Sequence, residues 1–116
     1  MIRIKRVYDP PSPDDGARVL VDRLWPRGIS KERARIDLWL KEVAPTTGLR
    51  EWYGHDPARW EEFRRRYRAE LAGKQDLIRT LREKEKEGTV TLVYSSREQQ
   101  LNNAVALKMF LEGEAE

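Results

Sequence analysis

The segment "DRLWPRG" at residues 22–28 places two arginines and a tryptophan where they could bind an anion. The planar guanidinium groups of Arg23 and Arg27 can each hold a carboxylate or a phosphate through two parallel hydrogen bonds. Trp25 lies between them and could stack on a base, a ring or a guanidinium group. The alternative is structural: Asp22 forms an ion pair with one of the two arginines and fixes the loop, while Trp25 is simply buried.

A second candidate anion site is "YSSRE" at residues 94–98. The β-branched, apolar segment 89–96 predicts a strand, and we expect a helix to begin at its end. Ser95 and Ser96 would then offer hydroxyl groups, the helix amino terminus would offer backbone donors, and Arg97 would add positive charge. The alternative is that Ser96 only caps the helix, because Gln99 follows it at the spacing of a capping box.

Two asparagines lie in the second turn of this expected helix, where asparagine has no advantage in helix propensity. We expect Asn102 or Asn103 to form a hydrogen bond to a neighbouring loop, and Asn102 is a candidate ligand contact. A purely structural role is the alternative.

His55 is the single histidine and the candidate catalytic residue. Histidine is the side-chain type best suited to proton transfer near neutral pH, and the adjacent Asp56 could orient it as a general acid or base. The alternative is a structural histidine in a loop. No nucleophile with an adjacent base can be identified in the sequence.

The elements that must position these residues follow from hydrophobic periodicity and from cap residues. Strands are expected at residues 2–7, 17–22, 37–43 and 89–96. Helices are expected after Ser30, before Gly54, from Asp56 to about Ala72, at 75–87 and from Ser96 onward. Strands that alternate with helices predict an α/β fold, with a small, mostly parallel sheet of about four strands covered by helices in a single compact domain over residues 1–116. The first two strands are joined by a loop alone, so they could instead pair antiparallel.

This architecture brings the two candidate loops together. Ligands of open α/β sheets bind outside the carboxyl ends of the strands, and both "DRLWPRG" and "YSSRE" follow a predicted strand directly. In a parallel arrangement the two loops lie at the same edge of the sheet.

The basic segment "RRRYR" at residues 64–68 is a weaker candidate for nucleic-acid binding. Its tyrosine belongs to an apolar stripe that docks on the core, formed by Trp60, Phe63, Tyr67 and Leu71. Ion pairs are expected at i,i+4 spacing, for Glu61 with Arg65, Glu62 with Arg66 and Arg66 with Glu70. Most of this charge is therefore neutralised locally.

Composition narrows the chemistry further. Of the 116 residues 37% are charged, the net charge is +3, and there is no cysteine. The absence of cysteine excludes disulfides, thiol catalysis and thiolate zinc sites, and we expect neither a metal site nor a cofactor. No apolar run approaches the roughly 20 residues of a membrane span, and the amino terminus lacks a secretory signal, so we expect a cytoplasmic protein without membrane contact. The oligomeric state stays open.

Three motifs carry a resemblance to a known family: "DRLWPRG", "LREWYGHDPARWEEFRRRYRAEL" and "VTLVYSSREQQLNNAVALKMFL". Together, and in this order, they resemble the YeaO-like family, a bacterial and archaeal domain of unknown function. The resemblance covers nearly the whole chain and implies a compact α/β domain without an established activity. The family positions are Asp22, Arg23, Trp25, Pro26, Arg27, Gly28, Leu49, Arg50, Trp52, His55, Trp60, Phe63, Arg66, Tyr67, Tyr94, Asn102 and Ala104.

The chain departs from the family pattern at two places. Members often carry a histidine just before the asparagine, where this chain has Leu101, which argues against a mechanism that needs two histidines. The loop after the last strand tends to carry lysine or aspartate, where this chain has Arg97 and Glu98. Charged side chains are kept there.

Three functional hypotheses follow. The leading one is a binder of a small anionic, phosphate-bearing ligand in a cleft between the two loops. The second is an enzyme that uses His55 as a general acid or base. The third is a module that binds nucleic acid or a protein partner without chemistry of its own.

Overall fold

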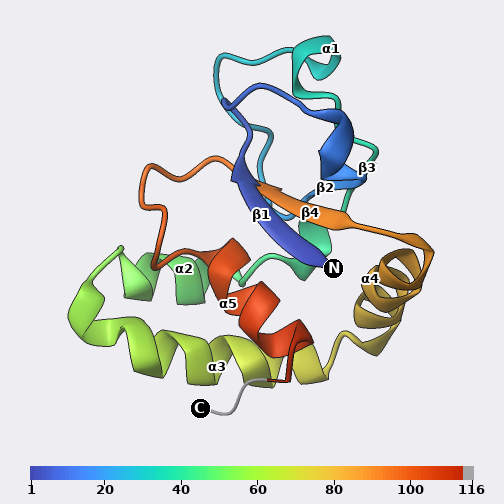
Figure 1. The fold of residues 1–116 in the computed structure, drawn as a ribbon. Coiled ribbons are helices and arrows are strands. Elements are labelled where there is room, and N and C mark those ends of the chain that lie inside the picture. The colour runs from blue at the N-terminus through green and yellow to red at the C-terminus, as the bar shows by residue number, and fades with distance from the viewer. Residues whose placement is uncertain (114–116) are drawn as a thin grey trace.

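A four-stranded, all-parallel sheet forms the centre of the protein (Figure 1). The structure is a computed structural model that describes residues 1–113. The strands lie in the order β1 (Ile2–Arg6), β4 (Val90–Tyr94), β2 (Ala17–Leu20) and β3 (Leu38–Trp39). The predicted α/β class with a small parallel sheet is confirmed. The antiparallel alternative for the first two strands is wrong, because β4 lies between them and pairs in parallel with both.

The helices cover the sheet on both faces. They are α1 (Lys31–Ala34), α2 (Thr47–Tyr53), α3 (Trp60–Ala72), α4 (Gln75–Glu87) and α5 (Asn103–Leu111), with 3-10 turns at Pro13–Asp15, Lys41–Val43 and Pro57–Arg59. Figure 1 shows α2 to α5 gathered on one side of the sheet and α1 on the other. Within residues 1–113, no helix is long and apolar enough to cross a membrane.

Strand β4 is buried along its whole length because its side chains feed two separate cores. Leu92 faces the larger core, which contains the side chains of α3 and α5, and Val93 faces the smaller core beside α1. The apolar, β-branched sequence of this strand suits a position with no exposed face. The predicted stripe of α3 is confirmed: Phe63 and Tyr67 are 2% and 1% exposed and stack with ring centroids 5.8 Å apart.

Several cap predictions are confirmed. The Ser30 hydroxyl accepts a hydrogen bond from the Arg33 N–H at the start of α1, and α2 ends at Gly54 with a left-handed φ of 53°. The Asp56 carboxylate caps the 3-10 turn that precedes α3.

The strand predicted at residues 37–43 is wrong in length. Only Leu38–Trp39 pairs with β2, and the chain then turns through the 3-10 segment Lys41–Val43. The turn places the Val43 side chain in the core, where it is completely buried. The alternation of apolar and polar residues alone does not distinguish this turn from a longer edge strand.

The predicted start of the last helix is also wrong. Helix α5 begins at Asn103, and its cap is Asn102, whose amide oxygen accepts a hydrogen bond from the Val105 N–H. The Ser96 hydroxyl accepts one from the Glu98 N–H instead, and the Glu98 carboxylate accepts two more from the N–H groups of Gln100 and Leu101. These local bonds give the backbone an alternative to the helix, so the segment between β4 and α5 forms successive turns.

A buried ionic cluster fixes β2 against the loop that precedes it. Asp15 is 1% exposed, and its carboxylate accepts hydrogen bonds from Lys5 Nζ at 2.8 Å and Arg18 Nη1 at 2.6 Å. The Arg18 guanidinium also donates to the carbonyl oxygens of Ala34 and Arg35, so every part of this buried charge is compensated. Burial by itself would raise the pKa of the Asp15 carboxyl, but the hydrogen bonds from Lys5, the Ser12 N–H and Arg18 outweigh it and hold the pKa below its ordinary value of 3.8.

Replacement of Asp15 by Asn is expected to lower the free energy of unfolding by about 3–5 kcal/mol, because it leaves the buried Arg18 charge without a counterion. Asp14→Asn is the matched control, since the Asp14 side chain is exposed. Urea denaturation measures both.

The pH dependence has a defined direction. The pKa of Asp15 is lower in the folded state, so its contribution to stability is present above pH 3.8 and is lost as the pH falls through the folded-state pKa. The Asp15→Asn variant should lack this acid-dependent loss. If Asp15→Asn and the control Asp14→Asn are equally stable at neutral pH, the structural role of the cluster is refuted.

Candidate functional site

A cleft of about 410 Å³ lies beyond the carboxyl ends of β2 and β4. It is lined by the loop after β1, the loop after β2, the segment from Ala44 through α2 to His55, one residue of α3, and both ends of the connection from β4 to α5. The lining residues are Tyr8, Asp22, Arg23, Leu24, Trp25, Pro26, Arg27, Ala44, Pro45, Arg50, Tyr53, His55, Phe63, Ser95, Ser96, Asn102 and Asn103. The two loops selected from the sequence, residues 22–28 and 94–98, therefore both contribute to one cavity.

Asp22 joins these loops. Its carboxylate oxygen Oδ2 accepts hydrogen bonds from the backbone N–H and the hydroxyl of Ser95, at 2.9 and 2.7 Å. Its other oxygen accepts one from Asn103 Nδ2 at 3.2 Å, and its backbone carbonyl accepts one from the indole N–H of Trp39 at 2.7 Å. The end of β2 is thus tied to the end of β4, to the start of α5 and to β3.

Arg23 lines the cleft but holds the polypeptide around it. Its guanidinium donates to the carbonyl oxygens of Ala44 at 3.0 Å and Pro45 at 3.4 Å, and it lies 3.3 Å from the Glu42 carboxylate. The expected alternative, an ion pair between Asp22 and an arginine of this loop, is absent from the part of the chain that the structure describes. Asp22 binds Ser95 and Asn103 instead.

Arg27 and Arg50 are placed differently. Both are exposed, both line the cleft, and within residues 1–113 neither guanidinium group forms a hydrogen bond or an ion pair. Arg27 was selected from the sequence as an anion contact, whereas Arg50 was named only as a position of the family motif. Its signal was its place in "LREWYG", a segment whose local pattern indicated only a short helix stopped by Gly54.

Trp25 is not simply buried, and its stacking on a ligand stays a prediction. Its indole N–H donates to the Ile29 carbonyl at 2.8 Å, and its ring lies edge-on to Trp39 at 5.6 Å between centroids. The ring is nevertheless only half-buried and lines the cleft. It is a fixed aromatic wall of the site.

The "YSSRE" segment contributes less positive charge than its sequence indicates. The Ser95 hydroxyl donates its proton to Asp22, so it can only accept from a ligand. Ser96 lines the cleft, and Arg97 is exposed but is not among the lining residues. Arg6 of β1 holds this segment in place, because its guanidinium donates to the carbonyl oxygens of Ser95 and Ser96 at 3.2 and 2.8 Å. The sequence indicated only that Arg6 alternates with apolar residues in a strand.

The two asparagines have structural bonds in the cleft wall. Asn102 is 1% exposed; its amide caps α5 and donates to the Glu98 carbonyl. Asn103 Nδ2 donates to the Val21 carbonyl as well as to Asp22. The expected hydrogen bond to a neighbouring loop is therefore formed, by Asn103.

His55 lies exposed at the rim, in a left-handed conformation with φ 57° directly after Gly54. Asp56 does not orient its ring: the Asp56 carboxylate accepts from the Ala58 N–H and lies 3.7 Å from Arg59. Across the cleft, hydrogen bonds from two backbone N–H groups, together with the charge of His55, hold the pKa of the Glu98 carboxyl below its usual range.

Tyr53, the last residue of α2, lines the cleft together with His55. Its hydroxyl donates to the Leu101 carbonyl at 2.7 Å and so connects α2 to the segment before α5. Burial, followed by the nearby charges of Glu98 and Asp56, raises the pKa of Tyr53 to about 12. The phenol therefore stays protonated and keeps this bond at neutral pH.

The balance of charge around the cleft is positive. Among the lining residues of the described chain, three are arginines and one, Asp22, carries a carboxylate, which already accepts three hydrogen bonds. In residues 1–113, no three His, Asp or Glu side chains gather as a potential metal site. The lining therefore combines positive charge with aromatic surface from Tyr8 and Trp25.

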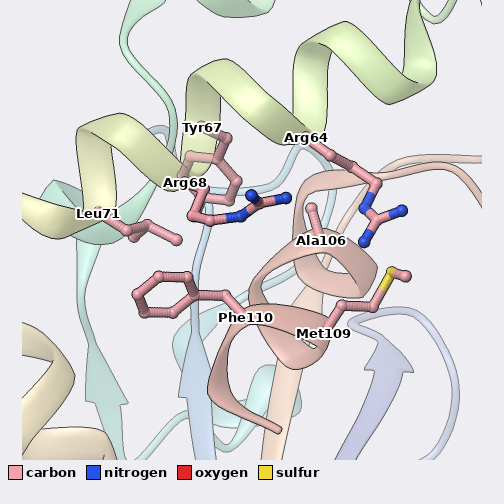
Figure 2. Close-up of a pocket in the computed structure, with 7 residues that line it drawn as sticks. All are labelled: Arg64, Tyr67, Arg68, Leu71, Ala106, Met109 and Phe110. Atoms are coloured by element: carbon pink, nitrogen blue, oxygen red, sulfur yellow. The ribbon is translucent and has the colours of Figure 1, made fainter. Parts of the chain in front are cut away.

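A second pocket and the basic segment of α3 lie outside this cleft. Figure 2 shows a small pocket of about 10 Å³ between α3 and α5, which is large enough for no more than a water molecule. On α3, Arg66 pairs with Glu62 as expected, and Arg64 pairs with Glu61 at i,i+3. Glu70 accepts two hydrogen bonds from Thr46 rather than pairing with Arg66.

Comparisons with known proteins agree with the resemblance seen in the sequence. Residues 1–116 match a family described as the inactive DUF488-N3 subclade. The chain is 45% identical to the uncharacterised protein Rv3073c of Mycobacterium tuberculosis over 112 residues, which cover 97% of this chain and 94% of that protein. It is 42% identical to the uncharacterised protein YeaO of Escherichia coli over 110 residues, covering 95% and 96%. No solved structure matches the chain.

Replacement of Asp22 by Ala tests whether the cleft depends on its junction. The variant leaves the Ser95 N–H, the Ser95 hydroxyl and the Asn103 amide without their acceptor, so we expect the free energy of unfolding to fall by about 3 kcal/mol. Asp76→Ala is the control, because its exposed pair with Arg79 should contribute less than about 1 kcal/mol. If the two variants are equally stable in urea denaturation, the junction does not hold the loops.

Proposed function

We propose that this chain, which belongs to the inactive DUF488-N3 subclade, binds a small phosphate-bearing ligand in the cleft between residues 22–28 and 94–98. The observation that carries the proposal is the pair Arg27 and Arg50. Both residues line the same cavity, and neither guanidinium group has a hydrogen-bond or ion-pair partner within residues 1–113. Charged groups that line a cavity without a counterion favour the entry of an ion of opposite sign.

The contrast with the other arginines near the cleft supports this assignment. Arg23 is bound to the carbonyl groups of Ala44 and Pro45, and Arg6 to those of Ser95 and Ser96. These two arginines hold the walls of the cleft. Arg27 and Arg50 are left to meet a ligand, and a phosphate can accept two parallel hydrogen bonds from a guanidinium group.

Binding without turnover is favoured over the enzyme hypothesis. The subclade is described as inactive, and His55 is the single histidine of the chain. His55 is exposed at the rim and has no hydrogen-bonded carboxylate to orient it among the described residues. We therefore assign His55 a position beside the ligand and no catalytic step.

Nucleic-acid binding through α3 receives less support. The arginines at positions 65 and 66 are paired with Glu62, and Arg66 also stacks on Trp52 with its guanidinium carbon 4.2 Å from the ring centroid. The cytoplasmic location and the absence of membrane contact stay predictions, and nucleic-acid binding stays the less favoured alternative.

Charge removal at the two unpartnered arginines tests the proposal. Arg27→Gln and Arg50→Gln should each weaken the binding of ribose 5-phosphate by roughly 10- to 100-fold, since each loses a charge-assisted contact worth about 1.5–3 kcal/mol. Isothermal titration calorimetry at low ionic strength measures the affinities.

Two matched controls isolate the effect. Arg79→Gln makes the same change of charge on α4, at the opposite flank of the molecule from α2 (Figure 1), and should leave the affinity unchanged. Arg97→Gln should cost less than either cleft variant, because Arg97 does not line the cavity. Absence of saturable binding by ribose 5-phosphate, or equal losses in all four variants, would refute the proposal.

A further inference from the structure

We infer that the ligand carries a planar aromatic ring next to its phosphate, as a nucleoside 5′-monophosphate does. This inference rests on the proposed function and adds the chemical class of the ligand. It assigns the phosphate to Arg27 and Arg50 and the ring to the apolar rim formed by Tyr8 and Leu24.

The size of the cleft is the first observation. At about 410 Å³ it falls within the range of roughly 300–1,000 Å³ that is typical of sites for drug-sized ligands. An inorganic phosphate or a short phosphorylated chain would leave most of this volume to water. A nucleoside monophosphate would fill it.

The second observation is the distribution of exposed hydrophobic side chains. In residues 1–113, the exposed large hydrophobic residues are Met1, Tyr8 and Leu24, and the last two both line the cleft. Leu24 is 68% exposed although it lies between Arg23 and the half-buried Trp25. Two exposed apolar side chains in the lining of one pocket favour a ligand with an apolar part.

The third observation is the way Tyr8 is held. Its hydroxyl donates to the Arg27 carbonyl at 2.7 Å, and the Arg6 guanidinium lies over its ring at 4.9 Å from the centroid. The ring is therefore fixed on one side by a cation and remains 41% exposed. A second ring that stacks on Tyr8 pays little ordering entropy and lies next to the residue that carries an unpartnered guanidinium.

Together, these observations place the expected sites for the ring and for the phosphate in one cavity. The bond from Tyr8 to the Arg27 carbonyl fixes an aromatic ring beside the backbone of a residue whose charged side chain lines the same cavity. A base and its phosphate require an aromatic surface and a positive charge in one cavity. Stacking of a base on an aromatic side chain changes affinity by roughly 5- to 100-fold in proteins that bind single-stranded nucleic acids. The same stacking is available to a free nucleotide.

The test compares AMP with its two halves, ribose 5-phosphate and adenosine, by calorimetry on the full chain. AMP should bind at least about 10-fold more tightly than either half. Tyr8→Ala should weaken AMP binding by about 5- to 100-fold and ribose 5-phosphate binding much less, because only AMP loses a stacking partner while both lose the bond that holds the Arg27 backbone. Arg50→Gln should weaken both phosphates to the same degree. Leu24→Ser is a second rim variant with the same expected pattern, and its exposure makes loss of folding a remote concern.

Each other outcome identifies what has failed. Equal affinities for AMP and ribose 5-phosphate, both sensitive to Arg50→Gln, would overturn the aromatic assignment and leave the phosphate site standing. Equal affinities for AMP and adenosine would overturn the phosphate site itself. A pentanucleotide of adenylate that binds much more tightly than AMP would show that the site receives a strand of nucleic acid rather than a free nucleotide, and it would overturn the inference in this form.

Discussion

The geometry of the cleft depends on the hydrogen bonds of one residue, Asp22. Its carboxylate holds the backbone and the hydroxyl of Ser95 and the amide of Asn103, and its carbonyl accepts from Trp39. The ends of three parallel strands and the start of α5 are thereby fixed around one side chain. The carboxylate of Asp22 binds neutral donors from these walls, and within residues 1–113 it forms no ion pair with the arginines that line the cavity.

The arginines near the cleft divide into two groups by what their guanidinium groups contact. Arg6 and Arg23 bind backbone carbonyl groups and keep the walls in place, whereas Arg27 and Arg50 face the cavity without a partner in residues 1–113. The sequence could not make this division. It treated Arg23 and Arg27 as equivalent, because their roles depend on where residues 44–45 and 95–96 lie in the fold.

Much of the fold could be predicted because it follows from periodicity. The continuous apolar pattern of β4 and the stripe of α3 indicated their burial, and the carboxyl ends of β2 and β4 indicated the edge of the sheet where a cavity forms. The errors arose where side chains compete locally for backbone groups. Glu98 and Ser96 stabilise turns that delay α5 until Asn103, and the same competition removed the helix terminus from the expected anion site.

The most direct test of this account is a titration of the chain with AMP, followed through the side-chain Nε–H signals of its arginines by nuclear magnetic resonance. The account predicts saturable shifts of the Arg27 and Arg50 signals, with the Arg79 signal unchanged and the wall-bound Arg23 signal changed little. Saturable AMP binding that leaves both the Arg27 and Arg50 signals in place would contradict it, because the ligand would then lie somewhere other than the cleft.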